Sequence, residues 1–322
     1  MVSMVPRIGE TCAVTAPEHR SGFACFVGRP NTGKSTLTNA LVGTKVAITS
    51  DRPQTTRHTI RGIISRPDSQ LVIVDTPGFH RPRTLLGSRL NDLVRGTLAE
   101  VDVLGLCIPA NEKIGPGDRY IAGELAKAMR KRSCAVAVVT KTDTVGKQQI
   151  GEQLLAVSKL GTEIGIDFAE IVPVSAVRGE QVELLADLLT KQLPPGPALY
   201  PDGELTDSPE EQMVAELIRE AALEGVRDEL PHSLAVVVEE MIPREGRSPE
   251  NPLLDIRAEL YVERDSQKGI VIGKGGARLR DVGTTARRQI EALLGTPVFL
   301  DLHVRIAKDW QRDPKQLRKL GF

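Results

Sequence analysis

The feature that most constrains this chain is the segment GRPNTGKS at residues 28–35. It matches the pattern GxxxxGK followed by Ser or Thr, and it lies between an apolar run and a helical pattern. Glycines in such a loop let backbone N–H groups converge on phosphate oxygens, and the helix N-terminus adds partial positive charge. We therefore expect Lys34 to reach the β- and γ-phosphates of a nucleoside triphosphate and Ser35 to coordinate Mg²⁺.

Apolar runs alternate with helical patterns around and after this loop. The strand candidates are residues 22–28, 71–75, 103–109, 134–140 and 171–174, and the helix candidates are residues 34–42, 86–100, 117–131, 150–160 and 182–192. The strands are apolar on both faces, as central strands of parallel sheets are. The pattern predicts an α/β domain with a mostly parallel sheet, helices on both faces and ligands beyond the carboxyl ends of the strands.

A proline-rich stretch separates this region from the rest of the chain. Five prolines lie between residues 194 and 209, where periodicity is weak, which indicates a linker. The order α-β-β-α-α-β follows and predicts a smaller α+β domain. The full prediction is a poorly ordered leader at 1–20, a nucleotide-binding domain at 21–194, a linker at 195–208, a second domain at 209–307 and a tail at 308–322.

Two further segments complete the predicted phosphate and magnesium site. The sequence DTPG at residues 75–78 ends a strand candidate, so the Asp75 carboxylate can hold Mg²⁺ and the Gly78 N–H can meet a γ-phosphate. The segment at residues 51–57 must supply a threonine that closes over Mg²⁺ when the γ-phosphate is present. Thr55 and Thr56 are the candidates, and we prefer Thr56 because it directly precedes an arginine.

The base is predicted by TKTD at residues 140–143, at the end of another strand candidate. The Asp143 carboxylate can accept hydrogen bonds from N1–H and the 2-amino group of guanine, which adenine does not offer. The backbone at Ser175-Ala176 would meet the guanine O6. The predicted nucleotide-binding residues are Gly28, Arg29, Pro30, Asn31, Thr32, Gly33, Lys34, Ser35, Thr36, Asp75, Thr76, Pro77, Gly78, Phe79, Thr140, Lys141, Thr142, Asp143, Ser175 and Ala176.

The second domain carries GKGG at residues 273–276, between two helical patterns. Such a GxxG turn lets the RNA backbone approach closely, so that about four nucleotides lie over an apolar groove. Basic and acidic residues each number 42, so attraction to RNA must be local; residues 264–322 hold 13 basic and 6 acidic residues. The predicted RNA-binding residues are Ile270, Ile272, Gly273, Lys274, Gly275, Gly276, Arg278 and Arg280.

Six segments of the chain together resemble the Era family of translation-factor-class GTPases. They are GRPNTGKSTL, SDRPQTTRH, DTPGFHRPR, TKTD, PVSA and GIVIGKGGARLR. The resemblance implies a P-loop GTPase domain followed by a type II KH domain. It implies GTP hydrolysis without the water-orienting glutamine of Ras-like proteins, because Phe79 stands after Gly78. Thr140 stands where the family usually has asparagine.

The resemblance also implies cofactors and partners. GTP or GDP and Mg²⁺ are expected, with Ser35, Thr56 and Asp75 at the metal and Lys34, Thr56, Gly78 and Asn31 in hydrolysis. Asn31 matches an asparagine that coordinates K⁺ in potassium-activated relatives; the alternative is a turn residue with no ion. The implied partners are the 3′ end of 16S ribosomal RNA and the 30S subunit, whose assembly and rRNA maturation the protein would assist.

Two alternatives stay open from the sequence. One is a nucleotide-gated RNA-binding module with incidental hydrolysis. The other is a GTPase at the cell membrane that couples growth or the cell cycle to translation. No apolar run approaches the roughly 20 residues that a membrane span requires. We therefore expect a cytoplasmic monomer, with peripheral association at the inner face of the membrane as the alternative.

Overall fold

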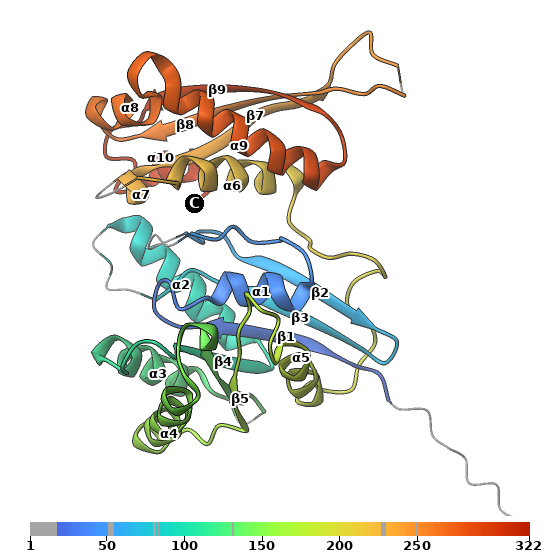
Figure 1. Cartoon of the computed structure of the whole chain (residues 1–322), viewed down its shortest axis with the longest axis vertical. Coiled ribbons are helices and arrows are strands. Elements are labelled where there is room, and N and C mark those ends of the chain that lie inside the picture. Colours follow the sequence, from blue (N-terminus) through green and yellow to red (C-terminus); the bar gives the residue numbers. More distant parts are fainter. Residues whose placement is uncertain are drawn as a thin grey trace, which may run out of the picture.

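The computed structural model describes residues 18–50, 55–79, 82, 84–130, 132–226, 230–248 and 250–322. They form two domains, stacked one above the other in Figure 1. The segment around residue 200 connects them along one side. Residues 1–17 of the predicted leader at 1–20, and residues 51–54 of the segment that was expected to supply a threonine to the metal, lie outside the described residues.

The first domain is built on a six-stranded sheet in the order β2-β3-β1-β4-β5-β6. All neighbouring strands are parallel except the β2–β3 pair. The strands are β1 (Arg20–Val27), β2 (Ile60–Arg66), β3 (Ser69–Asp75), β4 (Val103–Pro109), β5 (Cys134–Thr140) and β6 (Glu170–Pro173). The mostly parallel sheet is confirmed; only β2 was not predicted.

Helices cover both faces of this sheet, as predicted. They are α1 (Lys34–Val42), α2 (Leu85–Glu100), α3 (Pro116–Ala128), α4 (Lys147–Ile164) and α5 (Val182–Lys191). One hydrophobic core joins the sheet to α2, α3 and α4, for example through Val94, Leu125 and Val157. A second core joins the opposite face to α1 and α5, through Leu37 and Leu185.

The second domain has a three-stranded sheet in the order β7-β8-β9, in which β8 and β9 are parallel. Its elements are α6 (Glu210–Leu223), α7 (Leu230–Ser233), β7 (Ala235–Pro243), β8 (Leu254–Val262), α8 (Asp265–Ile272), η2 (Lys274–Gly276), α9 (Ala277–Leu294), β9 (Val298–Ile306) and α10 (Pro314–Lys319). The predicted α-β-β-α-α-β order is present. Its first helix, α6, ends at Leu223, because Glu224 is extended and Gly225 has a φ of 69°.

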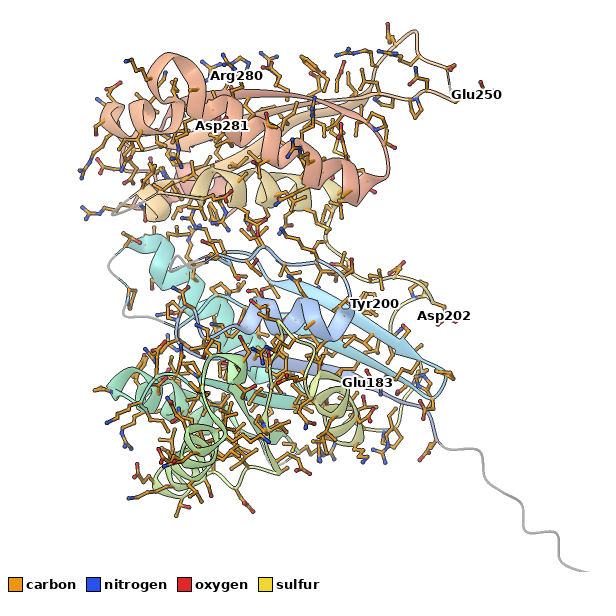
Figure 2. All side chains as sticks on the ribbon, viewed as in Figure 1. Glu183, Tyr200, Asp202, Glu250, Arg280 and Asp281 are labelled. Carbon is orange, nitrogen blue, oxygen red and sulfur yellow. The ribbon has the colours of Figure 1, made fainter. Side chains whose placement is uncertain are left out.

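The linker packs on the first domain along its length. The Gln70 side chain bonds the backbone of Leu199 and Tyr200, and Gly62 of edge strand β2 bridges to Thr206. Figure 2 labels Tyr200 on this stretch. Linker backbone therefore covers an edge strand that would otherwise present unpaired N–H and C=O groups.

The two ends of the described chain are also part of the fold. Strand β1 begins at Arg20, inside the predicted leader. The tail packs between the domains, where Trp310, Leu317 and Leu320 cluster with Leu86 and Leu90 of α2. Figure 1 marks the C-terminus at this interface. Across the described residues, no helix combines the length and apolar character that a membrane-spanning segment needs.

Candidate nucleotide and RNA sites

The predicted phosphate loop connects β1 to α1 at the carboxyl edge of the sheet. Gly33 precedes α1 with a φ of 90°, a conformation that favours glycine, and no side chain caps the helix. A Cβ on Gly28 would lie 2.7 Å from the carbonyl oxygen of Cys107, so glycine is required there. Lys34 is buried, and its Nζ donates to the carbonyl oxygens of Gly28 and Arg29 at 3.2 and 2.9 Å. The loop therefore presents backbone N–H groups and one ammonium to an anion.

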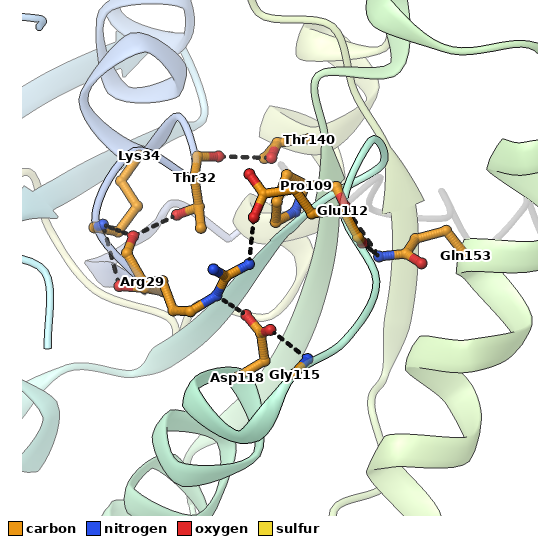
Figure 3. Close-up of polar contacts among 10 residues, drawn as sticks. Arg29, Thr32, Lys34, Pro109, Glu112, Gly115, Asp118, Thr140 and Gln153 are labelled. Atoms are coloured by element: carbon orange, nitrogen blue, oxygen red, sulfur yellow. Dashed lines mark hydrogen bonds and ion pairs between the residues drawn. The ribbon is translucent and has the colours of Figure 1, made fainter. Parts of the chain in front are cut away.

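The side chain of Arg29 points away from this loop. Its Nε bonds Asp118 of α3 at 2.7 Å and its Nη2 bonds Glu112 at 2.7 Å, as Figure 3 shows. These carboxylates raise the pKa of Arg29 mainly through the Asp118 hydrogen bond. The prediction that Arg29 binds nucleotide is thus restricted to its backbone.

Three oxygen-bearing side chains from separate segments meet beside Lys34. Ser35 Oγ donates to Asp75 Oδ2 at 2.7 Å, Thr56 Oγ1 lies 2.9 Å from Ser35 Oγ, and Thr56 Oγ1 donates to Asp75 Oδ2 at 3.3 Å. In the sequence, Thr56 lies 21 residues after Ser35 and Asp75 lies 40 residues after Ser35. The structure brings together the three residues that were expected at the metal, and Thr56 rather than Thr55 supplies the hydroxyl.

This cluster fits a divalent cation. Asp75 is fully buried, and its Oδ1 has no hydrogen-bond partner among the residues that the structure describes. Burial raises the pKa of Asp75, against the opposing effects of the Ser35 hydrogen bond and the Lys34 charge. An ionised carboxylate that is buried in this way is unfavourable unless a positive charge lies beside it. Hydroxyl and carboxylate oxygens are the ligands that Mg²⁺ takes, together with water and phosphate oxygens.

The phosphate pocket contains more residues than the motifs predict. Its lining is Pro30, Asn31, Gly33, Lys34, Ser35, Thr36, Ile48, Thr49, Ser50, Thr55, Thr56 and Gly78. Ile48 and Thr49 carry no motif, and only their position between α1 and Thr56 hinted at them, whereas Ser50 begins the segment SDRPQTTRH. A Cβ on Gly78 would lie 3.2 Å from the Pro30 nitrogen, so Gly78 closely approaches the phosphate loop.

Three predicted residues near Gly78 face the interior instead of the pocket. Thr76 and Pro77 are buried, and Phe79, which is 3% exposed, belongs to the core beneath α2 and α3. The Phe79 ring packs in this core and does not line the phosphate pocket, so the predicted nucleotide contact of Phe79 is restricted to its backbone.

The predicted base site forms at the ends of β5 and β6. Ser175 Oγ donates to Asp143 Oδ1 at 2.8 Å, while Asp143 Oδ2 has no hydrogen-bond partner among the described residues. Thr142 N bonds the Val174 carbonyl, which joins the two loops, and Lys141 has a φ of 56°. Half-buried Ala176 follows Ser175.

The threonine at position 140, where the family usually has asparagine, makes a contact of its own. Its Oγ1 donates to the Thr32 carbonyl at 2.6 Å, and both residues are buried. The hydroxyl thus ties the base loop to the phosphate loop, and Figure 3 shows this contact. Thr32 also bonds the Arg29 carbonyl, which stabilises the loop from within.

The predicted RNA loop joins α8 to α9. Gly273, Gly275 and Gly276 have φ values of 73°, 59° and 78°, and Lys274 is exposed. A Cβ on Gly273 would lie 2.7 Å from the Arg278 Cβ. The turn therefore requires glycine for its own geometry as well as for an approaching backbone.

An open groove of about 400 Å³ runs from this loop along α9 and β9. It is lined by Gly276, Leu279, Arg280, Gly283, Thr284, Arg287, Phe299, Leu300 and Leu302. Figure 2 labels Arg280 on the side of the domain that faces away from the first domain. Phe299, 52% exposed under the Arg244 guanidinium, was missed because a lone aromatic residue carries no motif.

Two predicted RNA residues make other contacts. The Arg278 guanidinium donates to the carbonyls of Ala222 and Glu224 at the end of α6. Ile272 packs against the hydrophobic core of the second domain, whereas Ile270 is 52% exposed beside the loop. The exposed residues of the predicted RNA site are thus Ile270, Lys274, Gly275 and Arg280.

These features define a P-loop GTPase joined to a KH domain. The sheet of the first domain carries a phosphate loop, a Ser–Thr–Asp cluster and a carboxylate placed for guanine, and the second domain carries a GxxG turn. Comparison with known families agrees, because the model of the 50S ribosome-binding GTPase family matches residues 23–141 and that of the KH domain matches residues 229–311. GTPase Era of Streptomyces coelicolor is 72% identical over 304 residues, covering 94% of this chain and 95% of its own length. GTPase Era of Nocardioides sp. is 72% identical over 306 residues, covering 95% and 97%. The chain belongs to the Era family of GTPases.

Two solved structures share the arrangement of both domains. Era in complex with MgGDPNP and nucleotides 1506–1542 of 16S ribosomal RNA is 36% identical, with a TM-score of 0.87 and coverage of 94% of this chain and 99% of that one. A variant of Aquifex aeolicus Era bound to GDP·AlF4⁻ is 35% identical, with the same TM-score and coverage.

The buried Asp75 carboxylate leads to a prediction about stability. A folded-state pKa above the unfolded value means that ionised Asp75 opposes folding near neutral pH when no cation is present. Asp75→Asn keeps an oxygen for Ser35 and Thr56 but removes the charge. We expect the nucleotide-free, Mg²⁺-free variant to gain roughly 0.5–2 kcal/mol in unfolding free energy. Urea unfolding measures this.

Asp118→Asn is the matched control, because Asp118 is equally buried but pairs with Arg29. It should lower the unfolding free energy by about 1–3 kcal/mol, since a neutral amide replaces one of the two carboxylates that pair with the Arg29 guanidinium. If the urea midpoint of unfolding falls for both variants, the buried charge of Asp75 does not destabilise the cation-free protein, and the prediction is wrong.

Proposed function

We propose that this protein is a GTP-driven switch that binds the 3′ end of 16S ribosomal RNA and assists 30S assembly and rRNA maturation. The observation that carries the proposal is the shared architecture, at a TM-score of 0.87, with an Era bound to MgGDPNP and a 16S ribosomal RNA fragment. The domain limits that go with it are 21–194 for the GTPase domain and 209–307 for the KH domain, joined by the linker at 195–208.

The chain's own residues divide the work at the nucleotide. Backbone N–H groups of the phosphate loop and Lys34 hold the phosphates and offset negative charge that develops during transfer. Ser35, Thr56 and Asp75 would hold Mg²⁺, which supplies charge neutralisation between the β- and γ-phosphates when bound. The Gly78 N–H would meet the γ-phosphate, and hydrolysis would release Thr56 and Gly78 together.

The location and assembly state proposed here are a cytoplasmic monomer acting on the 30S subunit. Peripheral association with the inner face of the membrane is the competing proposal, and flotation of the purified protein with anionic liposomes separates the two. Protein that stays at the bottom of the gradient supports the cytoplasmic proposal.

Guanine selectivity should depend on Asp143. Its Oδ2 is available for guanine while Oδ1 is oriented by Ser175. In Asp143→Asn an amide donor replaces an acceptor, so GDP affinity should fall by about one to two decades. Binding of the xanthine nucleotide XDP should improve. Fluorescence titration with GDP, XDP and ADP measures both effects, and unchanged GDP affinity would contradict the assignment.

RNA binding should depend on the exposed GxxG turn. Replacing Lys274 and Gly275 together by Asp adds bulk and reverses charge at the point where phosphate would approach. We expect binding to an RNA from the 16S 3′ end to collapse in a mobility-shift assay, with GTP binding unchanged. Wild-type binding should also weaken as salt increases.

Lys315→Asp together with Gly295→Asp is the matched control, because it makes one lysine and one positive-φ glycine acidic away from the turn. RNA binding by this control should exceed that of the GxxG variant. Equal binding by the GxxG variant and the wild type would mean that the turn is only structural.

Potassium is proposed as an activating ion. Asn31 lines the phosphate pocket next to Gly78, and no glutamine follows Gly78. A monovalent cation there would supply charge stabilisation of the kind an arginine finger gives. Hydrolysis should be faster in KCl than in NaCl at equal ionic strength and saturating Mg²⁺. Asn31→Ala should abolish the difference, and equal wild-type rates would remove K⁺ from the proposal.

A further inference from the structure

The residues on either side of Thr56 are both tied to the second domain. Arg219 of α6 donates from Nη2 to the Thr55 carbonyl. Arg57 donates from Nη1 to the Leu234 carbonyl at 2.7 Å. Thr56 itself is 6% exposed and its hydroxyl meets Ser35 and Asp75. The Thr55 carbonyl and the Arg57 side chain are therefore held by the second domain, while the Thr56 hydroxyl meets side chains of the first domain.

Arg219 is held rigidly on its own helix. Its Nε bonds Glu216 Oε1 at 3.0 Å and its Nη2 bonds Glu216 Oε2 at 2.5 Å. Arg219 is 1% exposed and Glu216 is 7% exposed. Two parallel bonds fix the plane of a guanidinium, so Arg219 presents a donor to Thr55 in one orientation. Little side-chain entropy is lost when that bond forms.

The same helix holds a second point on the rim of the phosphate pocket. Glu220 Oε1 accepts a hydrogen bond from Thr49 N at 2.8 Å, and Glu220 also pairs with Lys45. Thr49 and Thr55 both line the pocket. Helix α6 thus fixes the backbone at two places around the predicted γ-phosphate position.

The tail supports the residue that follows Thr56. The Arg57 guanidinium lies 5.6 Å from the Trp310 ring centroid and 5.8 Å from that of Phe322. His58 stacks on Phe322 at 5.0 Å. Burial, reinforced by the positive charge of Arg219, lowers the pKa of Arg57 to about 9. The aromatic faces offset part of that cost through cation–π attraction.

We propose that Arg219 is a positioning residue for GTP hydrolysis, holding the Thr55 carbonyl so that the Thr56 hydroxyl stays at the metal site. This inference rests on the proposed nucleotide site and adds that the RNA-binding domain supplies a residue to GTP recognition. Thr56 is expected to meet the metal only while the γ-phosphate is present. Arg219 therefore strengthens the binding and turnover of GTP without affecting the affinity for GDP.

The experiment uses the full chain and two fluorescent nucleotides, mant-GMPPNP and mant-GDP. The test variant is Arg219→Gln with Glu216→Gln, because removing both members of a buried ion pair leaves no unpaired charge. We expect mant-GMPPNP affinity to fall by about 10- to 100-fold, the worth of a hydrogen bond to a charged group. Mant-GDP affinity should stay within about twofold, and kcat should fall with the GMPPNP affinity.

Arg95→Gln is the matched control, because Arg95 pairs with Glu124 on the surface of the first domain and is 50% exposed. It should leave both affinities and kcat unchanged. Arg219→Lys keeps the charge but not the two-pronged contact, so it should restore only part of the GMPPNP affinity.

Two results would overturn the proposal. An equal loss of mant-GMPPNP and mant-GDP affinity would show a general structural role, and no change in either would show that Arg219 does not position Thr56. Wild-type protein that binds neither nucleotide would overturn the proposed nucleotide site as well, and that outcome is visible before any variant is made.

Discussion

The buried carboxylate of Asp75 is the group on which the functional arrangement depends. It ends the central strand β3, accepts hydrogen bonds from Ser35 and Thr56, and keeps one oxygen without a partner among the described residues. A charge in this position is costly unless a cation arrives with the nucleotide. The buried carboxylate therefore favours binding of a metal ion at the carboxyl edge of the sheet. The N-terminus of helix α1, which favours phosphate, lies at the same edge.

The second domain contacts residues that line this site. The C-terminal part of helix α6 contacts the rim of the phosphate pocket through Arg219 and Glu220. At the same end of the helix, the carbonyls of Ala222 and Glu224 accept hydrogen bonds from the Arg278 guanidinium, just beyond the GxxG turn. One helix therefore contacts both predicted sites. Because α6 also packs in the core of its domain, a displacement of this helix is resisted by many side chains.

The fold and the sites differ in how far they could be predicted. The central strands are continuous apolar runs and the phosphate loop is a local motif, so both were recognisable. Strand β2 was missed because its sequence, IRGIISR, is not a continuous apolar run: exposed Arg61 and Ser65 interrupt the isoleucines at this edge of the sheet. Phe79 was predicted among the nucleotide-binding residues because it directly follows the DTPG motif, but its ring lies in the core.

By itself, the sequence determined the chemistry available at each motif and the order of the two domains, because these depend on short spacings along the chain. Only the tertiary structure decided that Thr56 rather than Thr55 meets Asp75, and that Arg29 and Arg278 use their side chains on protein groups. It alone brought Arg219 to Thr55, 164 residues earlier in the chain. Such contacts depend on how separate helices and strands pack, and packing is a property of the whole chain that no local pattern encodes.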